Sequence, residues 1–192
     1  MKKITKLSAL LLVAAVFFAG CKEPGDSTGG ANTTPLFSES DTTVDIEGSE
    51  IELSDGAWSF KELTSFGSDS AAIVLDVTVT NGVPEVTKGS LFSSGTIPEG
   101  ASEEEIAEEK AMAEAQGLTF TISGNKYTVS GDFNEEGLKM YSSMFMYLPY
   151  SDFETLKTNE DKTKYYATEK AKQKNSDGTY TEGTVKYYLM KK

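Results

Sequence analysis

The stretch Ala72-Ile-Val-Leu-Asp-Val-Thr-Val-Thr-Asn-Gly82 alternates apolar and polar residues and then ends in Asn-Gly. The alternation places four apolar side chains on one face of a strand: Ile73, Leu75, Val77 and Val79. Asn-Gly after such a run is the strongest short-range signal of a β-hairpin. Val83 to Thr87 begins the return strand, in which Pro84 predicts an edge position or a bulge. A period of two with one polar face predicts an antiparallel sheet with one buried side.

Other parts of the chain repeat this pattern. Ala57 to Leu63 reads as a strand, and two more strands, 118–123 and 126–130, flank the turn Gly124-Asn125. A last hairpin joins 164–172 to 184–190 across a loop that contains Asp177-Gly178. We therefore expect a mostly β fold, an antiparallel meander that forms a single domain over residues 44–192.

Residues 102–116 break the strand pattern. Ser102-Glu-Glu-Glu105 is a capping box, its acidic residues suit the positive end of a helix dipole, and Gly117 can end a helix. The segment is predicted to be helical. Because its apolar face is thin, the helix is expected to be an insertion that lies over a barrel mouth or a sheet face.

Residues 135–147 allow two interpretations. Asp132 or Asn134 could cap a helix, and the apolar residues from Leu138 to Leu148 fit helical spacing. The same residues fit the alternation of a strand equally well. We favour the helix, so one or two helices are expected within the β domain.

The N-terminus has the composition of a secretory signal peptide over residues 1–20. Three lysines come first, an apolar run from Leu7 to Phe18 follows, and Ala19-Gly20 completes a small-residue cleavage site. The apolar run of about a dozen residues is shorter than the roughly 20 that a transmembrane helix needs. Residues 21–43 are rich in Gly, Ser, Thr and Asp, which predicts a flexible tether, although Leu36-Phe37 forms a small apolar island in it.

Cys21 is the only cysteine in the chain. Phe18-Ala-Gly-Cys21 resembles the lipobox of bacterial lipoproteins, with Phe18 in the place where leucine is usual. The resemblance implies cleavage before Cys21, diacylglycerol on its sulfur and attachment to a membrane through the acyl chains. Lys22 stands where aspartate would mark retention in the inner membrane, which implies the outer membrane. An ordinary signal peptide followed by an unmodified cysteine is the alternative.

Composition excludes several classes of function. The net charge of −12 becomes −15 without the three lysines of residues 1–20, and the chain has no arginine. Such a domain repels phosphate backbones, so nucleic acid is not an expected partner. Without histidine there is no Ser-His-Asp triad and no histidine zinc ligand. Serine–lysine and carboxylate-pair chemistry remain open, but we expect no enzyme, no catalytic residues, no cofactor and no metal.

Gly56-Ala-Trp58 resembles the Gly-x-Trp motif of lipocalins, which stands at the start of the first strand of an eight-stranded barrel. The resemblance implies a lipocalin-like β-barrel that Trp58 plugs at one end and that holds a small apolar ligand. Lipocalins usually stack an arginine on this tryptophan. Since this chain has none, Lys186 or Lys191 is expected to take that place.

The ligand-binding residues expected from this resemblance and from the Met- and aromatic-rich stretch 140–150 are Trp58, Phe60, Tyr141, Phe145 and Tyr147. The alternative function is an adhesin or a structural interaction protein that binds an envelope or host protein. Its surface would be an exposed aromatic patch formed by Tyr165, Tyr166, Tyr180, Tyr187 and Tyr188. The acidic residues 103–109 lack EF-hand spacing and are better explained as the start of a helix than as a calcium site.

Overall fold

The structure is a computed structural model that describes residues 34–47, 51–67, 69–97, 100–145, 153–174 and 179–192. The expected signal peptide, Cys21, Tyr147 and the Asp177-Gly178 turn lie outside these residues, as does most of the expected tether. Among the helices of the described residues, none has the length and apolar character to cross a bilayer.

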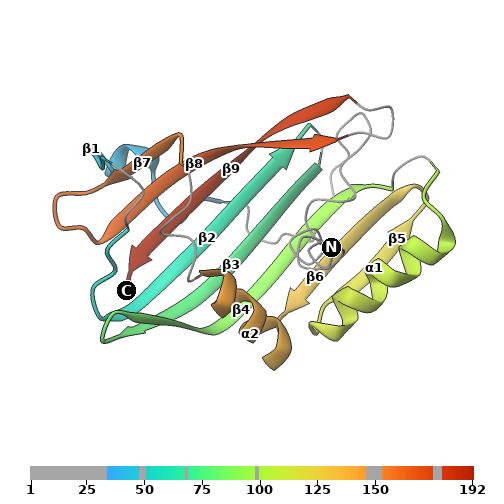
Figure 1. The fold of residues 1–192 in the computed structure, drawn as a ribbon, viewed down its shortest axis with the longest axis horizontal. Coiled ribbons are helices and arrows are strands. Elements are labelled where there is room, and N and C mark those ends of the chain that lie inside the picture. Colours follow the sequence, from blue (N-terminus) through green and yellow to red (C-terminus); the bar gives the residue numbers. More distant parts are fainter. Residues whose placement is uncertain (1–33, 48–50, 68, 98–99, 146–152, 175–178) are drawn as a thin grey trace, which may run out of the picture.

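The described residues form one nine-stranded antiparallel sheet in the order β1-β7-β8-β9-β2-β3-β4-β6-β5. Its strands are β1 (Val44–Asp45), β2 (Gly56–Phe66), β3 (Asp69–Thr80), β4 (Val83–Thr96), β5 (Thr119–Ser123), β6 (Lys126–Asp132), β7 (Thr155–Thr158), β8 (Lys164–Lys174) and β9 (Tyr180–Lys191). Figure 1 shows the long strands at the centre of this sheet. The predicted mostly β, antiparallel fold is confirmed.

The Asn81-Gly82 turn joins β3 to β4 as the sequence predicts. Asn81 has a φ of 52° and Gly82 a φ of 75°, so both are left-handed, as a tight hairpin turn of the primed type requires. Gly82 N also donates a hydrogen bond of 3.0 Å to Asp55 Oδ1, in the loop before β2. The turn is therefore tied to the start of the neighbouring strand.

Strand β4 shows both features that Pro84 predicted. It pairs with β3 along its length but with β6 only over 90–96, so Pro84 lies where β4 has a single neighbouring strand. The register with β3 shifts between Asp76, which pairs with Lys88, and Val77, which pairs with Val86. The residue left over in β4 forms a bulge.

Helix α1 (Glu103–Ala115) begins with the predicted capping box. Ser102 Oγ accepts a hydrogen bond of 3.2 Å from Glu105 N, and Ser102 N donates one of 2.8 Å to Glu105 Oε2. Gly117, with a φ of 88°, follows the helix end. Ala113 has no exposed surface and belongs to the main core, which attaches this otherwise exposed helix to the sheet.

Residues Glu135–Phe145 form helix α2, so the favoured helical interpretation of residues 135–147 is confirmed for the described part of that segment. Asn134, rather than Asp132, caps it: Asn134 Oδ1 accepts hydrogen bonds from Glu136 N at 3.1 Å and Gly137 N at 3.0 Å. Residues 146 and 147, the last two of the predicted segment, lie outside the described part of the chain.

The sheet is not closed into a barrel, so the predicted lipocalin-like barrel is not confirmed. Its outermost strands are β1 and β5, which do not pair with each other. The chain between β6 and β7 could have supplied a closing strand, but its described part forms α2. Strand β1 has only two residues and offers little edge for pairing. The last part of the described chain does return to the first long strand, because β9 pairs with β2.

The main hydrophobic core lies on one face of the sheet, here called the helix-covered face. Trp58 on β2 and its pairing partner Val77 on β3 both point to this face. Ala113 of α1 and Tyr141 of α2 join the same core, and Figure 1 shows both helices on this side. Alternate side chains of β2 and β9 point to the opposite face, here called the outer face.

Residues 34–41, here called the N-terminal strap, lie across the outer face. The Phe37 ring is 9% exposed and meets the Tyr188 ring edge-on, with 5.4 Å between the centroids. Tyr166 belongs to the same small apolar cluster, and Leu36 packs against it. The apolar island of the tether therefore covers two sheet tyrosines.

Three lysines of the sheet bind the strap, and the first of them is Lys164, whose Nζ donates a hydrogen bond of 2.6 Å to Asp41 Oδ2. Lys61 is buried and its Nζ donates a hydrogen bond of 2.6 Å to Thr34 O, while burial lowers the pKa of the Lys61 ammonium. Lys186 Nζ donates one of 2.8 Å to Glu39 Oε1, and this bond lowers the pKa of the Glu39 carboxyl. The packed domain thus extends at least to Thr34, about ten residues before the expected boundary at Val44.

Candidate functional site

Four aromatic rings meet on the helix-covered face, and we call them the ring cluster: Phe60, Phe145, Phe153 and Tyr187. Phe60 of β2 meets Phe145 of α2 edge-on at 5.3 Å and stacks on Tyr187 of β9 at 6.2 Å. Phe153, which precedes β7, meets Tyr187 edge-on at 5.5 Å. These centroid separations are typical of favourable aromatic pairs. Phe60 and Phe145 are buried, whereas Phe153 and Tyr187 are partly exposed, so the cluster runs from the core to the surface.

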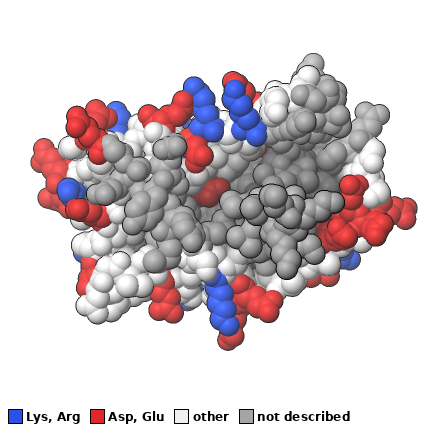
Figure 2. All heavy atoms as spheres, in the orientation of Figure 1, with Lys and Arg blue, Asp and Glu red and all other residues white. Residues whose placement is uncertain are grey.

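Two carboxylates adjoin the ring cluster. Glu62 follows Phe60 by two residues, points to the same face and pairs with Tyr187 across β2 and β9. Tyr187 Oη donates a hydrogen bond of 3.0 Å to Glu169 Oε2 on β8. Thr64 Oγ1 donates one of 3.0 Å to Glu62 Oε1. Both glutamates are partly exposed, and Figure 2 shows an acidic side chain near the centre of this face.

The electrostatics of Glu62 are unusual for a surface-accessible acid. Burial raises its pKa to about 7, the hydrogen bond from Thr64 opposes that shift, and the charge of Glu169 adds to it. Among the described residues, none of the ion pairs includes Glu62 or Glu169, because the lysines on neighbouring strands pair elsewhere. The two acids thus lie within range of each other's charge, and neither has a lysine partner in the part of the chain that the structure describes.

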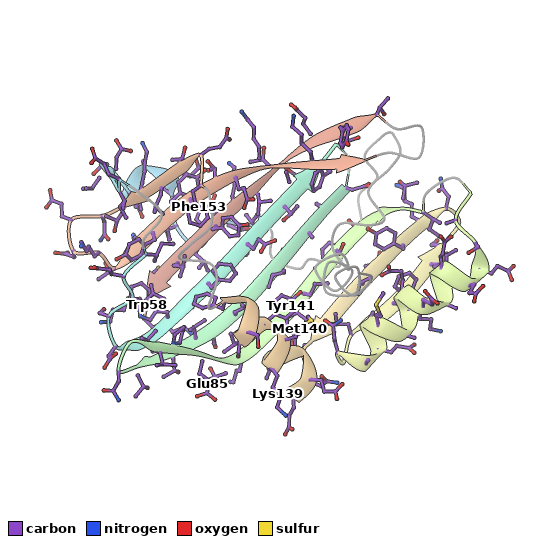
Figure 3. All side chains as sticks on the ribbon, viewed as in Figure 1. Trp58, Glu85, Lys139, Met140, Tyr141 and Phe153 are labelled. Atoms are coloured by element: carbon purple, nitrogen blue, oxygen red, sulfur yellow. The ribbon has the colours of Figure 1, made fainter. Side chains whose placement is uncertain are left out.

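The charge of Glu62 also reaches the hydroxyl group of Tyr141 on α2. Its side chain is only 8% exposed, and its ring packs 4.4 Å from the Phe133 ring. Burial raises the pKa of the Tyr141 hydroxyl well above its ordinary value, and the charge of Glu62 contributes to that shift. No hydrogen-bond partner of this hydroxyl occurs among the described residues. Figure 3 shows Tyr141 at α2 and Phe153 toward the β8–β9 side of the same face.

Trp58 is buried as predicted, with no exposed surface, but it lies near the start of β2 and forms none of the ring cluster's contacts. Its ring packs 6.1 Å from the Tyr165 ring, and its Nε1 donates a hydrogen bond of 2.9 Å to Ser54 O. Lys191 Nζ lies 5.9 Å from the centroid of the Trp58 ring. Lys191 therefore takes the place expected for a basic residue, whereas Lys186 lies on the outer face at the strap.

Of the other predicted ligand-binding residues, Phe60 and Phe145 belong to the ring cluster and Tyr141 does not. The structure brings Phe60 and Phe145 into direct contact and places Tyr141 within the electrostatic range of Glu62. Tyr147 lies outside the described residues. Sequence reasoning missed Glu62, Glu169 and Phe153, although the alternation Trp58-x-Phe60-x-Glu62 already places Glu62 on the buried face of its strand.

The five tyrosines expected on an exposed patch do not form one. Tyr165, Tyr166 and Tyr188 are buried, and Tyr187 is partly buried in the ring cluster. Tyr180, which is 61% exposed, is separated from them near the start of β9. Strand alternation sends Tyr165 and Tyr187 to the helix-covered face and Tyr166 and Tyr188 to the outer face, where the strap covers them.

A hollow with a volume of about 300 Å³ lies at the bulge of β4 rather than at the ring cluster. Asp76, Lys88 and Asp132 contribute to its lining, together with Phe133 and Leu138. It is open to solvent, and Asp76 Oδ1 already binds Lys192 Nζ at 2.6 Å. Within the described ranges, no three acidic, cysteine or histidine side chains lie close enough together to hold a metal ion. The ring cluster is thus the stronger candidate site.

Comparison of the chain with protein-family models, with curated proteins and with solved structures finds no match.

Proposed function

We propose that this chain is a lipid-anchored cell-envelope protein that binds a small apolar ligand at the ring cluster. The observation that carries the proposal is the ring cluster itself. Rings from β2, α2, β9 and the segment before β7 converge, and Phe153 and Tyr187 reach the surface. Small-molecule sites are lined mainly by such aromatic and apolar groups, with a few polar groups among them.

The anchor part of the proposal rests on the lipobox-like residues ending at Cys21. Acyl chains on Cys21 would hold the domain at the outer membrane, and the strap would connect that anchor to the outer face of the sheet. The domain is proposed to be an opened, lipocalin-like meander, because β9 returns to pair with β2. Catalysis is not part of the proposal.

Native mass spectrometry of the chain purified from its own membrane tests the ligand. We expect the wild-type chain to carry a small-molecule adduct, and Phe153→Ala to lose it, because this ring is the partly exposed contact of the cluster. Tyr180→Ala is the matched control, since it removes an exposed aromatic side chain outside the cluster. A wild-type chain that never carries an adduct, or a Phe153→Ala variant that retains it, contradicts the proposal.

A further inference from the structure

The contacts between the N-terminal strap and the outer face recognise a carboxylate. Glu39 Oε1 accepts hydrogen bonds from Lys186 Nζ at 2.8 Å and from Tyr188 Oη at 3.2 Å. Tyr188 has no exposed surface, so packing holds its hydroxyl in place as a donor to the strap. Hydrogen bonds to an ionised acceptor are among the stronger ones in proteins. The sheet thus presents a fixed pair of donors to one acid of the strap.

Two more side chains of the strap, each two residues from Glu39, are bound nearby. The Phe37 ring meets the Tyr188 ring edge-on and lies 5.4 Å from Lys164 Nζ. The same Lys164 ammonium binds Asp41 Oδ2 at 2.6 Å. The sheet therefore reads one aromatic ring and two carboxylates at alternate positions of a peptide, and its tyrosine and lysine side chains come from β8 and β9.

Side chains, and not strand pairing, hold the strap. Among the described residues, no backbone–backbone hydrogen bond joins residues 35–41 to a strand. Glu39 and Asp41 remain exposed to solvent in their ion pairs, and exposed pairs contribute little to stability. The strap can therefore leave the outer face without any loss of sheet pairing. A segment with the same groups would compete with it by mass action.

The charge of the surface under the strap is opposite to that of the whole chain. The chain has a net charge of −12, yet Lys61, Lys164 and Lys186 all contact the strap. Lys61 binds a backbone carbonyl oxygen, so the strap supplies two carboxylates to three lysines. The surface that an absent strap would leave is basic and aromatic, which complements an acidic segment that carries a ring.

We infer that the outer face is a peptide-binding surface for an acidic, aromatic segment of a second protein. The segment has the order aromatic-x-acid-x-acid, and the strap, with Phe37, Glu39 and Asp41 in that order, occupies its place within the chain. The strap of a second copy is a poorer occupant, because only Thr42 and Thr43 separate it from β1, which pairs with β7. This surface lies on the opposite side of the sheet from the ring cluster, so the inference goes beyond the proposed function.

The strap should act as an intramolecular competitor of such a segment, and this can be measured. The probe is a fluorescein-labelled peptide with the sequence of residues 34–42, Thr-Pro-Leu-Phe-Ser-Glu-Ser-Asp-Thr. It is titrated with the full chain in lipid nanodiscs, followed by fluorescence anisotropy, and empty nanodiscs give the background. Phe37→Ala weakens the chain's own strap, so we expect it to bind the peptide at least about tenfold more tightly than wild type does.

Further variants check the fold and the site of competition. Glu39→Gln also weakens the strap and serves if Phe37→Ala does not fold, as judged by circular dichroism. Thr43→Ala, at an exposed position after the strap, should bind the peptide as wild type does. Adding Tyr188→Phe to Phe37→Ala keeps the ring and removes the hydroxyl that binds Glu39, which should weaken the peptide by about tenfold. Adding Lys88→Gln, an exposed lysine of β4, should change nothing.

Two altered peptides test the recognised pattern. One has Gln and Asn in place of its Glu and Asp, and the other has the original composition in scrambled order. Both should bind the Phe37→Ala chain at least about tenfold more weakly than the original peptide, because they lack the carboxylates or their spacing from the ring.

Several outcomes overturn the inference. Equal affinity of the original peptide for wild type and Phe37→Ala would show that the peptide and the strap do not share a surface. Equal binding of the scrambled peptide would reduce the effect to attraction between charges, and binding to neither chain would remove the site. A wild-type chain that sediments as a dimer, beside a monomeric Phe37→Ala chain, would make a second copy the occupant in place of another protein.

Discussion

Lys191 Nζ lies 5.9 Å from the centroid of the Trp58 ring, and the two residues pair directly across β9 and β2. The last strand of the chain thus places a cation over the single tryptophan at the beginning of the first long strand. The Trp58 ring also packs against Tyr165 of β8. Trp58 therefore joins three strands at one end of the sheet.

Truncation of this ring should be strongly destabilising. Trp58→Ala removes a fully buried aromatic side chain, so we expect a loss of about 3–5 kcal/mol in the free energy of unfolding measured with urea. Because the chain has one tryptophan, its emission should be blue-shifted in the folded state and shift to the red on unfolding. Tyr180→Ala, at an exposed position, should change stability by no more than about 0.5 kcal/mol. Water-like emission from the folded chain would contradict the burial of Trp58.

Replacing Glu62 with an uncharged residue is expected to raise the free energy of unfolding by an amount that depends on pH. Its pKa is about 7 in the folded chain against an ordinary value of 4.5, so the folded state holds the proton more tightly. The charged carboxylate therefore costs stability as pH rises from about 4.5, and the cost is complete above about pH 7. Glu62→Gln should be more stable than wild type by about 2–3 kcal/mol at pH 8, and the two should be nearly equal at pH 4.5.

Urea unfolding at both pH values measures this difference. Glu85→Gln, an exposed acid on β4, is the control and should show no comparable pH dependence. An effect of Glu62→Gln that is the same at pH 4.5 and pH 8 would show that the carboxylate is not held in a desolvated place.

The strap should contribute to folding stability through Phe37. Phe37→Ala removes a 9% exposed ring that covers Tyr188, and we expect a loss of about 2–3 kcal/mol, at or somewhat below the lower end of the usual range for core phenylalanines. Thr43→Ala, at an exposed position in the following segment, should be nearly neutral. Unfolding midpoints in urea report both changes. Equal stability of Phe37→Ala and wild type would mean that the strap is not bound in solution.

Cys21 should carry the acyl chains. Cys21→Ala is expected to abolish metabolic labelling with radioactive palmitate and to leave the precursor unprocessed by the lipoprotein signal peptidase. Gel mobility and fractionation of the cells measure both effects. Lys22→Ala keeps the cysteine and should still be labelled. A labelled, processed Cys21→Ala chain in the membrane fraction would refute the anchor.

The hairpins could be predicted from the sequence because their signals are local. Asn81-Gly82 needs two left-handed residues, and the capping box at Ser102 needs two residues three apart. Both follow from short-range sterics and hydrogen bonds. The strap was less apparent, because Leu36 and Phe37 stand among polar residues and their partners on β8 and β9 come more than a hundred residues later.

The formation of α2 and the acidic part of the site depended on longer-range relationships. Strand and helix spacing both fitted 138–148, and only packing on the sheet decides for α2. Glu169 reaches the ring cluster because β8 aligns next to β9, a register that the sequence of β8 alone does not specify. Glu62 could have been noted, since its place in the strand alternation faces the core. The structure was needed to show that Glu62 has no lysine partner among the described residues.

The pairing of β9 with β2 has a consequence for how the chain is assembled. Strand β2 is flanked by β3, the next strand in the chain, and by β9, which begins more than a hundred residues after β2 ends. Until β9 is made, one backbone edge of β2 and one flank of Trp58 lack their native partners, so the sheet cannot be completed early. Long-range pairing of this kind slows folding, because the intervening chain must be ordered before the contact forms.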